Sequence, residues 1–277
     1  MVPRRKLDSP IELPYHTPLS CGRNEERGRT AHQDSGHVSY QHPYSVIDRF
    51  FVGIEPQWGG IDAIEFTQGR PVSYVKRFGV AGGELRVRHL KPTSHPNIVN
   101  LRETFIVDNA AFFVYEPWGI SLREFRQLQP IFRLGEVEVA TICGQVLNGL
   151  AYIHNELGMV HGKIQEGNIY IMENGDVKIA NIGERMIQQA KDDARGRDIG
   201  ALGDLVKTVL GLQSDDGTRG TTGLLARDFA GAACSATIEE LLKHPFLKLQ
   251  SGGWCLRPMG VLCAIAQKWR QGAGIGD

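Results

Sequence analysis

The sequence predicts an α+β fold in which a small antiparallel β-sheet precedes a mainly helical half. The first observation is a set of short β-type runs bounded by glycine or proline, as in a meander. These runs lie at 50–52, 61–66 and 72–78. The second is a series of apolar residues spaced three and four apart over 136–154, which indicates a long amphipathic helix. The third is the dipeptide Asn174-Gly175 between two apolar runs, which indicates a β-hairpin.

Local patterns predict the elements of the helical half. Residues 121–125 begin a short helix that precedes the long one. The hairpin consists of the runs 168–172 and 176–180. Thr237 and Glu240 have the spacing of a capping box, so a further helix is expected over 238–244.

Composition excludes several classes of protein. Lys plus Arg and Asp plus Glu both total 31, so net charge gives no reason to expect binding to nucleic acid or membranes. The five cysteines contain no C-x-x-C pair, which argues against a zinc site and favours a reducing compartment. The apolar run 260–266 is too short to span a bilayer, and the N-terminus does not read as a secretory signal. We therefore expect a soluble cytoplasmic or nuclear protein.

Composition also divides the chain into four parts. Residues 1–45 are rich in Pro, Arg, Ser, His and Gly and are predicted to form a flexible arm. The sheet half then covers 46–117, the helical half 118–250 and a C-terminal extension 251–277. The extension either packs on the helical half as an added short helix or presents an exposed docking patch.

The segment 160–183 carries the most informative motif. It reads V-H-G-K-I-Q-E-G-N-I-Y-I-M-E-N-G-D-V-K-I-A-N-I-G and resembles the catalytic loop H-R-D-L-x-x-x-N followed by D-F-G in protein kinases. His161 and Asn168 match this pattern. Lys163 replaces the catalytic aspartate, and Asn181 replaces the aspartate of D-F-G.

The resemblance to the protein kinase family extends over about residues 50–250. It implies a two-lobed fold, with one short helix in the sheet lobe. Val72-Ser-Tyr-Val-Lys76 resembles the V-A-I-K strand, so Lys76 is the candidate phosphate-binding lysine and Glu84 its carboxylate partner. The resemblance implies that any retained nucleotide would be held by Lys76, Glu84, Glu116 and Asn168, and any metal by Asn168 and Asn181.

Departures from the family pattern are as informative as the matches. The glycine-rich loop is replaced by G-I-E-P-Q-W-G-G at 53–60, where a glutamate would repel phosphate. Tyr74 and Tyr170 stand at the roof and floor of the adenine pocket, so we expect these two rings to plug it. Asp198 begins the segment that resembles the helix beneath the catalytic loop. It follows Asn181 by only 17 positions, which implies a truncated activation segment.

These substitutions remove the groups that phosphoryl transfer requires. The ammonium of Lys163 cannot accept a proton, so no catalytic residue is expected at the base position. A surface position, or an ion pair with Asp176 or Asp198, is the expected role of Lys163. Asn181 offers magnesium a neutral oxygen in place of a carboxylate.

The sequence therefore predicts a pseudokinase without a cofactor. Among kinase-like proteins it most resembles the degenerate ones of filamentous fungi, in which H-G and N-I-G replace H-R-D and D-F-G. We expect it to act as a scaffold in signalling, by binding another protein such as an active kinase.

Two alternatives remain open. One is an enzyme: either a weak or atypical ATP-dependent protein serine/threonine kinase that uses ATP and Mg²⁺, with Lys76, Glu84 and Asn168 holding the nucleotide, or a nucleotide-transfer enzyme that uses the fold differently. In that case Glu166, three positions after Lys163, could supply the missing carboxylate. The other is that the short activation segment reflects a mis-spliced gene model.

Overall fold

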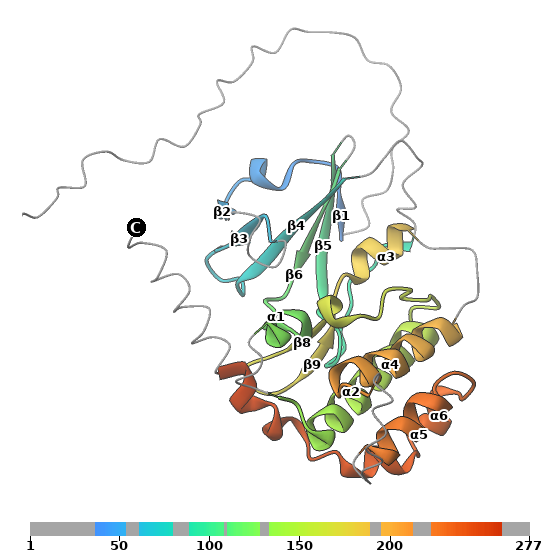
Figure 1. Cartoon of the computed structure of the whole chain (residues 1–277). Helices are drawn as coiled ribbons and strands as arrows, with labels where there is room; N and C mark the ends of the chain where they lie inside the picture. The colour runs from blue at the N-terminus through green and yellow to red at the C-terminus, as the bar shows by residue number, and fades with distance from the viewer. Residues whose placement is uncertain are drawn as a thin grey trace, which may run out of the picture. The chain divides into compact units, whose positions relative to one another are not determined.

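The computed structural model describes residues 37–53, 61–79, 89–107, 110–127, 133–188, 195–212 and 223–261. These residues form a six-stranded sheet followed by a mainly helical half, which confirms the predicted α+β class (Figure 1). The strands of the sheet are β1 (Val38–Ser39), β2 (Phe51–Gly53), β3 (Ala63–Glu65), β4 (Ser73–Gly79), β5 (Leu101–Val107) and β6 (Ala110–Tyr115). Their spatial order is β1-β5-β6-β4-β3-β2. All neighbouring pairs are antiparallel except β1 and β5.

The strand β1 corrects the predicted boundary of the N-terminal arm. Residues 37–45 were assigned to a flexible arm, but Val38 is buried and lies opposite Thr104 of β5. A 3₁₀ turn, Pro43–Ser45, follows. The pattern of apolar residues could not reveal β1, because a two-residue strand is held mainly by backbone hydrogen bonds to its neighbour. Residues 1–36 lie outside the described part of the chain.

The two faces of the sheet pack against different clusters. On one face, Phe113 and Tyr115 of β6 belong to the large core shared with the helical half. On the other face, Phe112 and Val114 pack in a smaller cluster with Val75 of β4. This alternation follows from the two-residue period of a strand. The predicted short helix around Glu84 and the loop 54–60 lie outside the described residues.

The helical half also matches the predicted order. Its helices are α1 (Leu122–Arg126), α2 (Glu136–Asn155), α3 (Ile182–Gln188), α4 (Arg195–Val209), α5 (Leu224–Ala232) and α6 (Ile238–Leu241), with 3₁₀ turns Glu166–Asn168, Pro245–Leu249 and Gly253–Cys255. A second sheet contains β7 (Ile120–Ser121), β8 (Ile169–Ile171) and β9 (Val177–Ile179). The predicted hairpin is thus confirmed as β8 and β9, and Thr237 caps α6 with the expected capping box. The sequence analysis did not predict α3 or α5.

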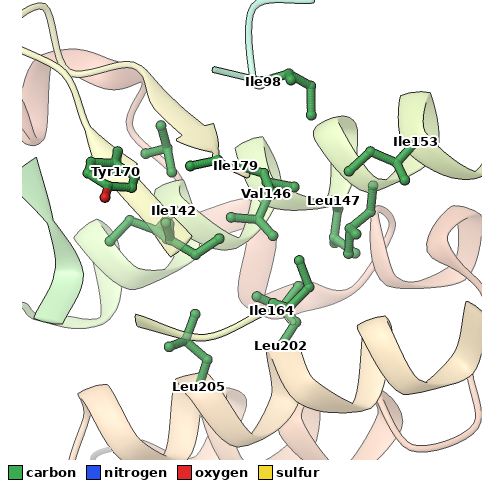
Figure 2. Close-up of a cluster of buried hydrophobic side chains, with 14 of the residues drawn as sticks. Ile98, Ile142, Val146, Leu147, Ile153, Ile164, Tyr170, Ile179, Leu202 and Leu205 are labelled. Atoms are coloured by element: carbon green, nitrogen blue, oxygen red, sulfur yellow. The ribbon is translucent and has the colours of Figure 1, made fainter. Parts of the chain in front are cut away.

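The long helix α2 organises the core of the helical half. Its apolar face lies against β9 on one side and α4 on the other (Figure 2). Figure 2 shows Ile142, Val146 and Leu147 of α2 gathered with Ile179 of β9 and Leu202 of α4. All five are at most 2% exposed, so the three-and-four spacing in the sequence corresponds to a fully buried stripe.

The described part of the C-terminal extension packs on the helical half. Ser251 donates its backbone N–H to Thr141 of α2 at 3.1 Å, and Leu256 is fully buried. This favours the packing alternative for residues 251–261, although Trp254 remains 70% exposed. Among the described helices, none is both long and apolar enough to cross a membrane.

Candidate functional site

The side chain of Asp198 holds the start of the loop between α2 and β8, residues 161–168, by hydrogen bonds to its backbone. This carboxylate lies in the first turn of α4 and is 1% exposed. It accepts the backbone N–H groups of His161 at 2.8 Å and Gly162 at 2.6 Å, and it lies 2.9 Å from Nε2 of His154. A buried carboxylate is stable only with such partners, so Asp198 sets the position of the loop.

His161 is a structural residue of this loop. Its ring is fully buried, with Nε2 2.9 Å from the carbonyl oxygen of Ala180. Its Nδ1 accepts the backbone N–H of Lys163 at 3.3 Å, which assigns the proton to Nε2. Burial lowers the pKa of His161, so the neutral ring is favoured.

The base position is occupied by an exposed lysine. Lys163 makes no ion pair with Asp176 or Asp198 among the described residues: Asp176 accepts from Asn174 at 2.7 Å, and Asp198 is engaged as above. Glu166, the candidate replacement carboxylate, lies 2.5 Å from Arg126 of α1. The carboxylate of Glu166, which could have served as a base, is therefore already held in an ion pair with Arg126.

The two asparagines predicted as metal ligands hydrogen-bond to each other. Asn168 donates to the carbonyl oxygen of Lys163 at 2.7 Å and accepts from Asn181 Nδ2 at 2.8 Å. Asn181, whose φ is +65°, accepts from the Lys76 ammonium at 2.5 Å. Both amide oxygens therefore already accept a hydrogen bond, and a fixed cation lies beside one of them.

This donor set does not fit magnesium well. Magnesium is normally held by one or two carboxylates, and the Lys76 ammonium would repel it. In the part of the chain that the structure describes, no three His, Cys, Asp or Glu side chains gather in a way that could hold a metal ion.

The carboxylate partner of Lys76 is a residue that the sequence analysis missed. Glu184 Oε1 in α3 lies 3.0 Å from Lys76 Nζ, while the predicted partner, Glu84, lies outside the described residues. Glu184 is 5% exposed and accepts the hydroxyl of Tyr115 at 2.5 Å. Tyr115 in turn accepts the backbone N–H of Gly183 at 2.9 Å. Burial and the charge of Glu184 raise the pKa of Tyr115, which keeps its proton available for donation.

A cluster of three aromatic rings in edge-to-face contact links the sheet to β8. The ring of Trp118, in the segment that joins the two halves, lies 4.9 Å from Tyr74 and 5.9 Å from Tyr170, between ring centroids. Figure 2 shows Tyr170 on β8 at the edge of the buried cluster. Burial raises the pKa of both tyrosines. The sequence analysis named the two tyrosines but missed Trp118, for which the only signal was a large aromatic residue two positions after Glu116.

Glu116, the remaining candidate nucleotide ligand, is held in a structural network. Its Oε1 accepts from Lys178 of β9 at 2.7 Å and from the backbone N–H of Asn100 at 3.0 Å. Because Lys178 is itself 9% exposed, this pair satisfies two groups at the boundary between the sheet and the helical half.

Comparison with known proteins agrees with a protein-kinase-like fold. The family model of the protein kinase domain matches residues 83–195, which include the loop, the hairpin and α3. This match places residues 83–195 in the protein kinase superfamily. The matched range begins between β4 and β5 of the sheet half and ends at the first residue of α4.

The curated relatives of this chain are named as protein kinases. The chain is 34% identical over 102 residues to serine/threonine-protein kinase Tao of Drosophila melanogaster, covering 37% of this chain and 10% of that protein. It is 30% identical over 151 residues to TAO3 of Xenopus laevis, covering 49% and 16%. It is 36% identical over 98 residues to cyclin-dependent kinase F-3 of Oryza sativa subsp. japonica, covering 35% and 22%. The chain thus spans less than a quarter of the length of each of these relatives.

Proposed function

We propose that this protein-kinase-like chain is a pseudokinase that acts in signalling by binding another protein. The observation that carries the proposal is the chain of hydrogen bonds Lys76–Asn181–Asn168, in which groups expected to bind phosphate and metal bind each other. In an active kinase these groups must be free for ATP and magnesium.

The base position supports the same conclusion. Lys163 cannot accept a proton from a substrate hydroxyl, and the nearest alternative, Glu166, is paired with Arg126. Recruiting Glu166 would require breaking an ion pair of 2.5 Å and moving its carboxylate.

The aromatic cluster of Tyr74, Trp118 and Tyr170 supports the absence of nucleotide binding. A base that entered between Tyr74 and Tyr170 would have to displace Trp118, because the Trp118 ring already contacts both tyrosine rings. Contacts of this kind contribute about 0.5–1.5 kcal/mol each beyond the area they bury, so displacement would oppose binding.

Thermal unfolding with Mg-ATP tests this proposal. We expect no change in the melting temperature of the full chain at millimolar Mg-ATP. A nucleotide present at about 100 times its Kd would add about 2.7 kcal/mol to the free energy of unfolding, which is easily detected. A rise that grows with ATP concentration in the wild type and disappears in Lys76→Ala would refute the proposal.

A second candidate is a weak or atypical ATP-dependent protein serine/threonine kinase. It is favoured by the retention of Lys76 and Asn168 and by the relatives being protein kinases by name. This candidate predicts transfer of labelled phosphate to protein that is lost in both Lys76→Ala and Asn168→Ala. Incorporation that survives both substitutions would instead identify a contaminating kinase.

The proposed partner is a protein such as an active kinase or another signalling component. Proteins that co-purify with the full chain should be tested individually, as purified components, for direct and saturable binding. A variant lacking residues 1–36 is the appropriate comparison, because a deletion to residue 45 would also remove β1. If no co-purified protein binds directly, the protein-binding role is wrong even if the domain proves inactive.

A further inference from the structure

Helix α3 lies at the boundary between the sheet and the helical half. Figure 1 shows it beside β5. It begins at Ile182, directly after Asn181, whose φ is +65°. Its apolar side chains Ile182 and Met186 are at most 1% exposed, so the helix is anchored in the core by burial. Glu184, on the same short helix, is buried as well and needs polar partners.

Those partners come from two strands of the sheet. Glu184 Oε1 lies 3.0 Å from Lys76 of β4, and Oε2 accepts the hydroxyl of Tyr115 of β6 at 2.5 Å. The oxygen Oε1 makes no hydrogen bond of good geometry among the described residues, so its burial depends on the ion pair with Lys76. One carboxylate thus links two neighbouring strands to α3.

The surrounding packing leaves little freedom on either side of α3. A Cβ at Gly183 would lie 2.6 Å from Phe113 and 2.8 Å from the Tyr115 hydroxyl, so the start of α3 presses directly on β6. On the other side, a Cβ at Gly162 would lie 2.9 Å from the guanidinium of Arg185. The arginine of α3 therefore fills space next to the loop 161–168.

We propose that α3 is an internal strap that holds the sheet and the helical half in one closed arrangement without any ligand. In this proposal Glu184 acts as a built-in anion for Lys76, in the place where an external anion would otherwise be needed. The inference goes beyond the proposed function, because it concerns how the two halves are held and not which partner they bind. A partner-binding surface that spans both halves would then be present at all times.

Hydrogen exchange of the full chain tests the strap. Glu184→Gln removes the charge and keeps the shape, whereas Glu166→Gln is a matched control whose ion pair with Arg126 joins only elements of the helical half. A hydrogen bond to a charged group corresponds to about a tenfold to hundredfold change in local opening. We expect amide exchange in α3 and β4 to accelerate by that factor in Glu184→Gln, with α2 unchanged and with no such acceleration in Glu166→Gln.

Adding tripolyphosphate provides a second readout, because only a role of Glu184 as the anion for Lys76 predicts that an external anion can replace its carboxylate. Added to Glu184→Gln, this anion should restore protection of β4 by occupying the space beside Lys76, and it should have no effect on Glu184→Gln/Lys76→Met. Unchanged exchange in α3 and β4 of Glu184→Gln, or equal protection of the wild type by the anion, would overturn the proposal.

If Glu184→Gln loosens the whole domain, including α2, Tyr115→Phe decides the question. This variant removes one hydroxyl and leaves the charge pair in place. Local acceleration in α3 would support the strap, and wild-type exchange there would refute it. None of these outcomes depends on phosphate transfer, so failure of the strap and failure of the pseudokinase assignment are separable.

Discussion

Substitution of Asp198 by asparagine should strongly destabilise the domain. Asp198 Oδ1 accepts the N–H of Gly162 at 2.6 Å, and Oδ2 accepts the N–H of His161 at 2.8 Å. An asparagine has one acceptor oxygen, so its amide nitrogen must face at least one of these backbone donors. The change removes a charged hydrogen bond, worth about 1.5–3 kcal/mol, and leaves a buried donor unpaired at a cost of about 1–3 kcal/mol. We expect a total loss of about 2.5–6 kcal/mol.

Urea or thermal unfolding of the full chain measures this effect. For a domain of this size, about 1 kcal/mol corresponds to roughly 2–4 °C in Tm, so the melting temperature should fall by about 5–24 °C. Asp204→Asn is the matched control, because Asp204 lies in the same helix with its side chain 75% exposed and should change stability by less than about 1 kcal/mol. If Asp198→Asn were as stable as this control, the assignment of Asp198 as the anchor of the loop would be wrong.

Three further predictions concern stability. Because burial lowers the pKa of His161, the unfolded chain binds more protons than the folded one as pH falls below about 6.5, so stability should decrease there. Urea unfolding at pH 7.5 and 5.5 measures this decrease, which should be smaller in His161→Gln. Gly175→Ala should lower Tm by several degrees more than Gly158→Ala, because both have positive φ but only at Gly175 would a Cβ collide with backbone. Arg126→Ala removes a partly exposed ion pair and should cost at most about 1 kcal/mol in thermal unfolding.

The sequence predicts elements well where burial repeats with a regular period. The long helix α2 and the hairpin of β8 and β9 agree with prediction within one or two residues, because their apolar spacing and the Asn174-Gly175 turn are local signals. The strand β1 and helix α3 lack such signals. Only two residues form β1, and the seven residues of α3 read I-G-E-R-M-I-Q and begin inside the motif N-I-G, whose glycine suggests a loop.

Part of the candidate site is also predictable from the sequence, because some of its residues follow a local pattern. The spacing of His161, Asn168 and Asn181 identifies the loop and its following turn directly from the sequence. The partner of Lys76 depends on where the chain turns after β9, and Asn181 makes this turn with a φ of +65°. Asparagine tolerates that conformation better than most residues. No local sequence pattern indicates that this turn places Glu184 against the sheet.

The need to neutralise Lys76 relates the asparagine at position 181 to the carboxylate of Glu184. The side chain of Lys76 is 23% exposed, so its ammonium loses part of its hydration and needs an anion nearby. Asn181 offers only a neutral oxygen, whereas the buried carboxylate of Glu184, three positions later, supplies the charge. An asparagine at position 181 is therefore compatible with a stable site because Glu184 neutralises the lysine. The same contact leaves Lys76 less available to an external phosphate, so the group that stabilises this arrangement also opposes nucleotide binding.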